Sequence, residues 1–238
     1  MPDSLYTQTH NIPYGIPLTK GQNAKLSGVH KFGFNSAVGT AYESIWDGGG
    51  VYPWQTSADQ LVATSASGSS DAGKKITIQG VDAAYNNLSE ELTLDANGSA
   101  TTTAEYYRVN RAFNSGPDAF VGAIDIDDDG TSTLRARVEV DYQQTQMAVY
   151  TIPAEHEGFI VQLSAGIQKN QEIVLKLNTR EPGGVWRTKS LISTFAEHID
   201  RKFDFPFHLT PGTDIDLQCK AGATTAISAD MEIVLDSY

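Results

Sequence analysis

Polar and apolar residues alternate with a period of two over much of the chain. The pattern is clear in residues 75–81, 134–142 and 213–219. It is typical of a strand with one buried face and one solvated face. About a dozen such segments follow one another, separated by short clusters of Gly, Pro, Asn, Asp and Ser. This spacing predicts an all-β protein built as a sandwich or a barrel, and we expect a β-sandwich of the jelly-roll type.

Helical patterns are short. Ser57 and Gln60 have the spacing of a capping box, so one helical turn could follow them. Phe195, Ile199 and Phe203 recur at intervals of four, which allows a short helix or a turn within 193–203.

The density of strand patterns divides the chain into three regions. Residues 1–50 are rich in Gly and Pro but poor in strand pattern, and we expect an extended N-terminal arm with little core of its own. Residues 51–146 form a first group of β-strands, and residues 147–238 form a C-terminal β-sandwich that is jelly-roll-like. The two groups are either two sandwiches or two halves of one.

The composition excludes several functional classes. The 238 residues include 17 Lys and Arg against 29 Asp and Glu, a formal net charge of −12, and 40% are hydrophobic. Such a chain is globular. Its acidity argues against binding to nucleic acid and to anionic membranes. The N-terminus lacks the basic and apolar regions of a signal peptide, so we expect a protein assembled in the cytoplasm or inside a larger particle.

The charge is unevenly distributed. Lys20, Lys25 and Lys31 lie in the expected arm, where no Asp or Glu occurs between Leu5 and Tyr42. We therefore expect a mildly basic arm that meets an acidic partner surface. In the 213–219 segment the carboxylates of Asp214 and Asp216 alternate with apolar residues, which predicts that they lie on the solvated face of a strand.

One segment has the start of a metal-binding motif. Asp125, Asp127 and Asp129, followed by Gly130, match the D-x-D-x-D-G opening of a calcium loop. Position twelve of that frame is Ala136 rather than the bidentate Glu, and the flanks alternate like strands. A β-hairpin with an Asp-Gly turn is therefore the favoured alternative. No catalytic or cofactor-binding motif is found, so we expect neither an enzyme nor a cofactor.

Aromatic residues gather around a glycine run. Tyr42, Trp46, Tyr52 and Trp54 surround Gly48–Gly50. Aromatic side chains at this density could bury area against another subunit, pack within one subunit or form a platform for a sugar. All three interpretations remain open at the level of sequence.

Six segments together resemble virion structural proteins of tailed bacteriophages, especially marine and cyanobacterial ones. They are residues 30–35, 43–50, 78–86, 107–112, 147–154 and 180–187. The resemblance implies a capsid-associated, neck or tail role in the virion. Proteins of this kind include capsid cement or decoration proteins, which are β-sandwiches that often sit as trimers on the shell. No site residue carries over.

The resemblance and the residue patterns favour a non-enzymatic cement protein that binds the major capsid protein and itself, as a homotrimer. A neck, tail or fibre-base component is one alternative. A glycan-binding β-sandwich is another, supported by Trp46, Tyr52, Trp54 and Trp186.

Overall fold

The computed structural model describes residues 15–168, 171–195 and 197–238. These residues form an all-β protein of small antiparallel sheets, as the alternating pattern predicts. No helix among them has the length and hydropathy to cross a membrane. The elements are α1 (Gly15–Thr19), β1 (Leu26–Val38), β2 (Glu43–Ser44), β3 (Leu61–Ser65), the 3₁₀ turn η1 (Gly68–Asp71), β4 (Lys75–Val81), β5 (Asn87–Thr93), β6 (Ser99–Thr101), β7 (Arg108–Asn114), β8 (Ile124–Asp128), β9 (Leu134–Val138), β10 (Val149–Thr151), β11 (His156–Ile167), β12 (Ile173–Arg180), β13 (Arg187–Thr194), β14 (His198–Leu209), β15 (Asp214–Ala221) and β16 (Thr225–Ser237).

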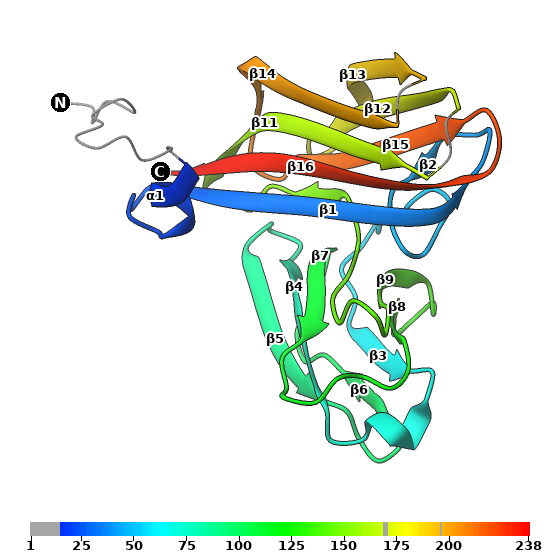
Figure 1. Cartoon of the computed structure of the whole chain (residues 1–238). Helices are drawn as coiled ribbons and strands as arrows, with labels where there is room; N and C mark the ends of the chain where they lie inside the picture. Colours follow the sequence, from blue (N-terminus) through cyan, green and yellow to red (C-terminus); the bar gives the residue numbers. More distant parts are fainter. Residues whose placement is uncertain (1–14, 169–170, 196) are drawn as a thin grey trace.

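Two sheets form what we call the body, built from β1, β2 and β10–β16 (Figure 1). The first sheet has the order β1-β16-β11-β14 and the second has the order β10-β15-β12-β13, with β2 paired to β15. One buried cluster combines side chains of the first sheet, such as Ile160 and Met231, with side chains of the second, such as Leu175 and Leu217. The two sheets therefore share one core.

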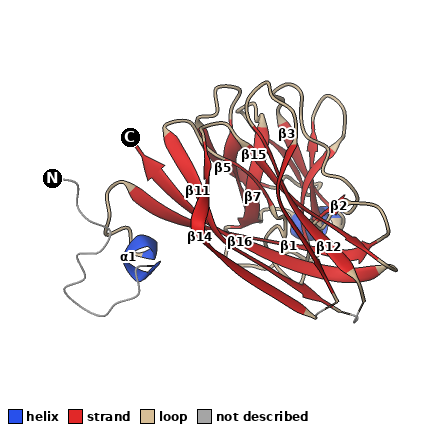
Figure 2. Ribbon diagram, turned by 90° about the horizontal axis from the view of Figure 1, so that it is seen from above, coloured by secondary structure: helices blue, strands red, loops and turns tan. Residues whose placement is uncertain are grey.

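Residues 46–147 form a second part, which we call the inserted unit. Its sheets have the orders β6-β3-β8-β9 and β5-β4-β7. They surround a separate buried cluster that includes Leu61, Ile78 and Ile126. The chain enters and leaves this unit at neighbouring points, because Trp46 and Met147 form an isolated antiparallel bridge. The unit lies beyond the β1 edge of the body in Figure 1, and Figure 2 shows the long strands of the body from above.

The prediction of an extended arm over residues 1–50 is wrong for residues 26–38. Residues 1–14 lie outside the described part of the chain, but Leu26–Val38 form β1, which pairs with β16 from Leu26↔Asp236 to Val38↔Thr225. The sequence pattern does not predict this strand, because polar and small residues occupy the positions that face inward. Lys31, Gly33 and Asn35 are buried, while Phe32 and Phe34 are only partly buried.

Neither of the short helices that the spacing allowed is found among the described residues. Leu61, which the capping-box spacing allowed in a helical turn, begins β3, and the 193–203 segment belongs to β13 and β14 apart from the connection between them. An interval of four residues is compatible with a strand, since every second residue shares a face. Ile199 is buried and Phe203 packs against the core of the body, so these two positions share one face, whereas Phe195 is exposed in the connection before β14.

Candidate functional site

A buried ion-pair network joins the body to the inserted unit. Asp214 begins β15 in the body, and Arg108 begins β7 in the inserted unit. Arg108 Nε and Nη2 donate to the two carboxylate oxygens of Asp214 at 2.8 and 3.0 Å. Arg180 of β12 donates to Oδ2 at 2.6 Å, and the Thr151 hydroxyl donates to Oδ1 at 2.7 Å. The side chains of Arg108 and Asp214 are 2% and 3% exposed, so this carboxylate is almost fully desolvated.

The network fixes both partners in place. The remaining Arg108 nitrogen, Nη1, donates to the backbone carbonyls of Gln55 and Tyr107 at 2.9 and 2.7 Å. The guanidinium also lies 3.8 Å from the centroid of the Tyr107 ring. Bidentate pairs of this kind fix geometry as well as charge. The arrangement holds two folded parts at one relative orientation, and we call it the joint.

Further polar contacts extend the joint along β7 and β10. Asn110 Nδ2 donates to the Thr151 carbonyl at 3.2 Å, and the Thr151 amide donates to Asn110 Oδ1 at 2.9 Å. Lys31 of β1 donates to the Asn110 carbonyl at 2.5 Å. Burial, together with the nearby charge of Arg111, lowers the pKa of Lys31 to about 7. Lys31, which was expected in an arm that contacts another protein, is therefore a buried part of the joint.

The other two predicted arm lysines have different surroundings. Lys20 and Lys25 are both exposed. The Lys25 carbonyl accepts hydrogen bonds from the amide and the hydroxyl of Ser237, at 2.8 and 3.2 Å. The backbone at Lys25 is therefore attached to the end of β16 while its ammonium group faces solvent.

The aromatic residues around the glycine run form a ladder. Ring centroids are 5.0 Å apart for Trp46 and Tyr52, 4.9 Å for Tyr52 and Trp54, and 5.1 Å for Trp54 and Trp186. Trp46 and Tyr52 are each 3% exposed, so within the chain they pack as core and have no free face for a sugar. Tyr42 lies apart from this ladder, beneath the Lys176 ammonium group at 4.0 Å. Trp186, at 37% exposure, is where the ladder reaches the surface.

Asp214 and Asp216 contradict the prediction of a solvated strand face. They are 2% and 1% exposed. The strand assignment itself is right, but their face is covered by the joint and by the segment around Ser44. Ser44 Oγ and Gln218 Nε2 donate to Asp216 Oδ2 at 3.1 and 2.8 Å. Burial raises the pKa of Asp216 to about 6, although hydrogen bonds from Ser44 and Gln218 oppose that rise.

The candidate calcium ligands lie on or just after β8. Asp125 forms a bidentate pair with Arg137, at 2.6 and 2.9 Å. Asp127 lies on β8 opposite Leu134, and the Asp129 amide donates to the Gln60 carbonyl. Within the described ranges, no group of three or more His, Cys, Asp or Glu side chains is placed to hold a metal ion. The segment forms the β8–β9 hairpin that the sequence favoured as the alternative.

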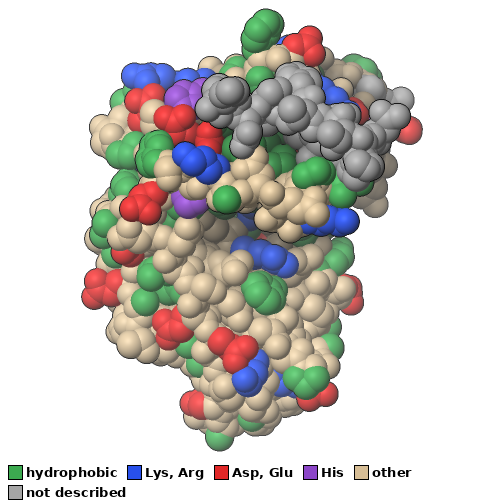
Figure 3. Space-filling model, turned by 90° about the vertical axis from the view of Figure 1, so that its left-hand side faces the viewer, with side chains coloured by type: hydrophobic (Ala, Val, Ile, Leu, Met, Phe, Trp, Pro, Cys, Tyr) green, Lys and Arg blue, Asp and Glu red, His purple; other side chains and the backbone are tan. Residues whose placement is uncertain are grey.

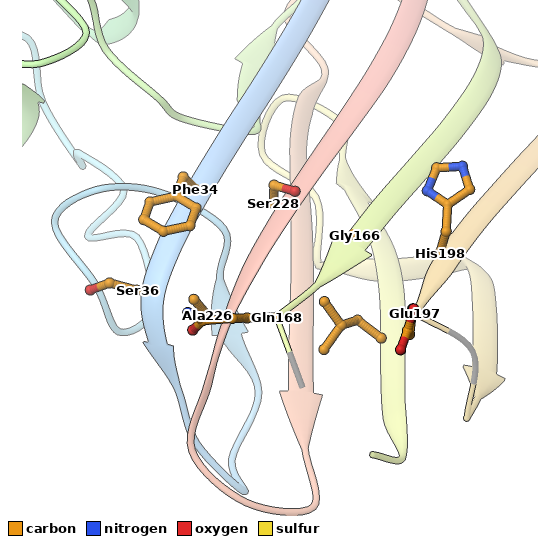
Figure 4. A pocket seen from close by; sticks show the side chains of 9 residues that line it. Phe34, Ser36, Gly166, Gln168, Glu197, His198, Ala226 and Ser228 are labelled. Atoms are coloured by element: carbon orange, nitrogen blue, oxygen red, sulfur yellow. The ribbon is translucent and has the colours of Figure 1, made fainter. Parts of the chain in front are cut away.

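Two histidines on the outer face of the first sheet lie beside acidic side chains, His30 on β1 and His208 on β14. His30 lies 2.5 Å from Glu232 and 3.6 Å from Asp230, and His208 lies 3.1 Å from Glu157. Histidine and acidic side chains lie close together on the face seen in Figure 3. At one end of the sheet, Gly166 and Ser228 form the floor of a shallow groove of about 800 Å³ (Figure 4).

The sequence did not single out Arg108, Arg180 or Asn110, which build the joint. Arg108 and Asn110 share one face of β7, and both are buried. A strand with two polar residues on its inward face is a signal of a buried polar contact, but its partners cannot be assigned from one chain. Asp214 is 106 residues away from Arg108, and only the fold brings the two together.

Comparisons with known proteins do not assign the chain to a family. No family model matches it, and no curated protein matches it. Among solved structures, similarity is found to the structures of infectious bursal disease virus Gt strain (TM-score 0.27, 11% identity, 90% of this chain and 73% of that chain) and Gx strain (0.25, 12%, 89% and 72%). It is also found to the infectious bursal disease virus VP2 subviral particle (0.22, 11%, 90% and 73%). Similarity at this level carries no argument about what this protein does, so the argument for function has to come from this chain itself.

Proposed function

We propose that this chain is a non-enzymatic structural protein of a virion, and specifically a cement or decoration protein that binds the major capsid protein. The observation that carries the proposal is the strand order of the body. Leaving out the two-residue β2, the strands of the body in chain order are β1 and β10–β16. The first sheet then has the order 1-8-3-6 and the second has the order 2-7-4-5.

We interpret this order as that of a jelly roll. Strands 1 and 8, 2 and 7, 3 and 6, and 4 and 5 pair antiparallel, as they would in one long hairpin that is rolled up into two sheets. Viral capsid and lectin domains are common users of this architecture. Because fold alone does not define function, the virion role also draws on the resemblance of six sequence segments to phage virion proteins.

The joint supports a structural role. A protein that reinforces a shell has to transmit force without internal hinges. The buried Arg108–Asp214 pair holds the inserted unit against the body, and Arg180 and Thr151 occupy further acceptor positions of the same carboxylate. The exposed Lys20 and Lys25 are the residues that we propose for contact with an acidic surface of the major capsid protein.

The location and copy number of the chain in purified particles test this proposal. Hundreds of copies on the shell, and particles that break at lower temperature when the chain is omitted, are expected for a cement protein. About a dozen copies at one vertex would instead indicate a neck or tail component. Absence of the chain from intact particles would refute the virion role altogether.

The basic contact has its own test. Charge reversal at Lys20 and Lys25 together should weaken the binding of purified protein to shells, and added salt should weaken wild-type binding in the same way. Lys75→Glu, on the inserted unit, is the matched control. Equal binding by the double variant and the control would remove Lys20 and Lys25 from the interface.

A further inference from the structure

One side of the body has two open sheet edges. β14 is the last strand of the first sheet, and β13 is the last strand of the second. Both lie on the side of the body away from the inserted unit (Figure 1). Most residues of both strands are exposed, in contrast to β12 and β15, which are mostly buried. We call this surface the β13–β14 side.

Large apolar side chains project from this surface. Phe205 is 91% exposed, Phe195 is 66% exposed and Leu191 is 57% exposed. Their neighbours Ile192 and Phe207 are only partly buried and pack against the core of the body. The apolar core of the body therefore reaches the two edge strands, and these strands and their connection also expose three large apolar side chains to solvent.

The shape of β14 shows how a partner would engage it. The register jumps from Phe207 opposite Ile160 to Lys202 opposite Gln162, so residues 203–206 bulge away from β11. Pro206 lies within the bulge and has no amide hydrogen to donate. Bulges and prolines protect an edge against the addition of another strand. Phe205 thus stands on a bulge that favours side-chain packing by a partner over strand pairing.

The charge of the β13–β14 side differs from that of the rest of the chain. Residues 187–209 carry four Lys or Arg and three Asp or Glu, whereas the remaining residues carry 13 and 26. Arg201 and Lys202 directly precede the bulge, and both are exposed. A slightly basic surface with large apolar side chains is complementary to an acidic surface. The chain itself provides carboxylates on the outer face of the first sheet, where Asp230 and Glu232 lie on β16 beside His30, with side chains that are 42% and 45% exposed.

We propose that the β13–β14 side docks on the acidic outer face of the first sheet of a second copy of this chain. The contact is head-to-tail, because the two surfaces differ, and such contacts close into rings when the rotation between subunits permits. Phe205 and Leu191 act as the apolar anchors, and Arg201 and Lys202 provide the charge match. The proposal rests on the assembly role proposed above and identifies the surface through which copies contact each other.

The mass of the purified full-length chain in solution tests the proposal, measured by sedimentation velocity over a range of concentrations. Wild-type protein is expected to form oligomers that higher salt weakens. Phe205→Asp and Leu191→Asp are each expected to raise the dissociation constant about 30-fold or more, as for an interface hot spot. Val121→Asp is the matched control, because Val121 is also exposed, at 57%, but lies in the inserted unit.

Variants are compared only where circular dichroism and the unfolding midpoint match those of wild type. Arg201→Glu tests the same contact by changing its charge and leaving the apolar side chains intact. A wild-type chain that stays monomeric at every concentration would overturn the proposal. So would a Phe205→Asp variant with wild-type mass, or a Val121→Asp control that dissociates equally. These results come from purified protein, so they stay separate from a failure to find the chain in particles.

Discussion

Replacing Arg108 by Ala tests whether the joint couples the two cores. The change removes two hydrogen bonds to Asp214 and two to backbone carbonyls, all within a network whose main side chains are 2–3% exposed. Breaking a buried ion pair by removing one partner costs about 3–5 kcal/mol, because the other charge stays buried. Arg180 still pairs with Asp214, so we expect the lower half of that range.

The assay is equilibrium unfolding in urea, followed by tryptophan fluorescence and by circular dichroism. Each kcal/mol shifts the unfolding midpoint of a chain of this size by roughly 2–4 °C, so a thermal scan should show a drop of roughly 6–16 °C. We also expect the two optical signals to separate in the variant, because the contact between the two parts of the chain is weakened. Coincident signals in wild type indicate one cooperative transition.

Arg137→Ala is the control. Arg137 pairs with Asp125 in a similar bidentate geometry, but the two side chains are 32% and 37% exposed. Exposed pairs contribute about 0–1 kcal/mol. The proposed coupling is refuted if Arg108→Ala and Arg137→Ala lower the free energy of unfolding equally, or if Arg108→Ala lowers it by less than about 1 kcal/mol. In either case the buried ion pair does not couple the two cores.

Three further changes probe other parts of the molecule. Gly33→Ala should lower the free energy of unfolding in urea by about 1–3 kcal/mol, because a Cβ there would collide with the Ile45 carbonyl and the Ala148 amide. Gly28→Ala on the same strand is the control, because its Cβ meets open space and the change should cost little. In the folded state Asp216 keeps its proton up to about pH 6, whereas in the unfolded chain it loses the proton near its ordinary pKa of 3.8. Its contribution to stability is therefore greatest below pH 3.8 and falls as the pH rises to about 6. Asp216→Asn should flatten the pH dependence of the free energy of unfolding over that interval, and an unchanged slope would contradict the burial argument. Millimolar calcium should leave the unfolding midpoint unchanged, because Asp125 is already engaged by Arg137; a rise in the midpoint that Asp127→Asn removes would show a cation site at the hairpin.

Alternation predicted the all-β class because it reports a local property, namely that one face of a strand is buried. It failed for β1, where the inward positions are Lys31, Gly33 and Asn35. Gly33 is required there by the close approach of the Ile45 and Ala148 backbones, and Lys31 by a carbonyl on the inserted unit. These are constraints from distant residues, which a local pattern cannot contain.

The same limit explains the prediction about Asp214 and Asp216. The alternation in the 213–219 segment identified a strand with polar residues on one face, and β15 is that strand. Whether a polar face meets water or other polar groups depends on what covers it. Here the cover comes from Arg108, Arg180 and the segment near Ser44, which are distant in sequence. For the same reason the sequence left open whether Trp46 and Tyr52 lie on the surface or in the core, and the fold places both in the core.

The pairing of β1 with β16 has a consequence for the order of folding during synthesis. Leu26 of β1 can pair only after Asp236 of β16 is synthesised, more than two hundred residues later. The strands in the sheets of the inserted unit pair only within residues 61–138. Closing so long a loop is slow compared with forming local contacts. The inserted unit can therefore fold before β16 leaves the ribosome. Arg108 is then already in position when β15 emerges, and Asp214 pairs with it as the body forms.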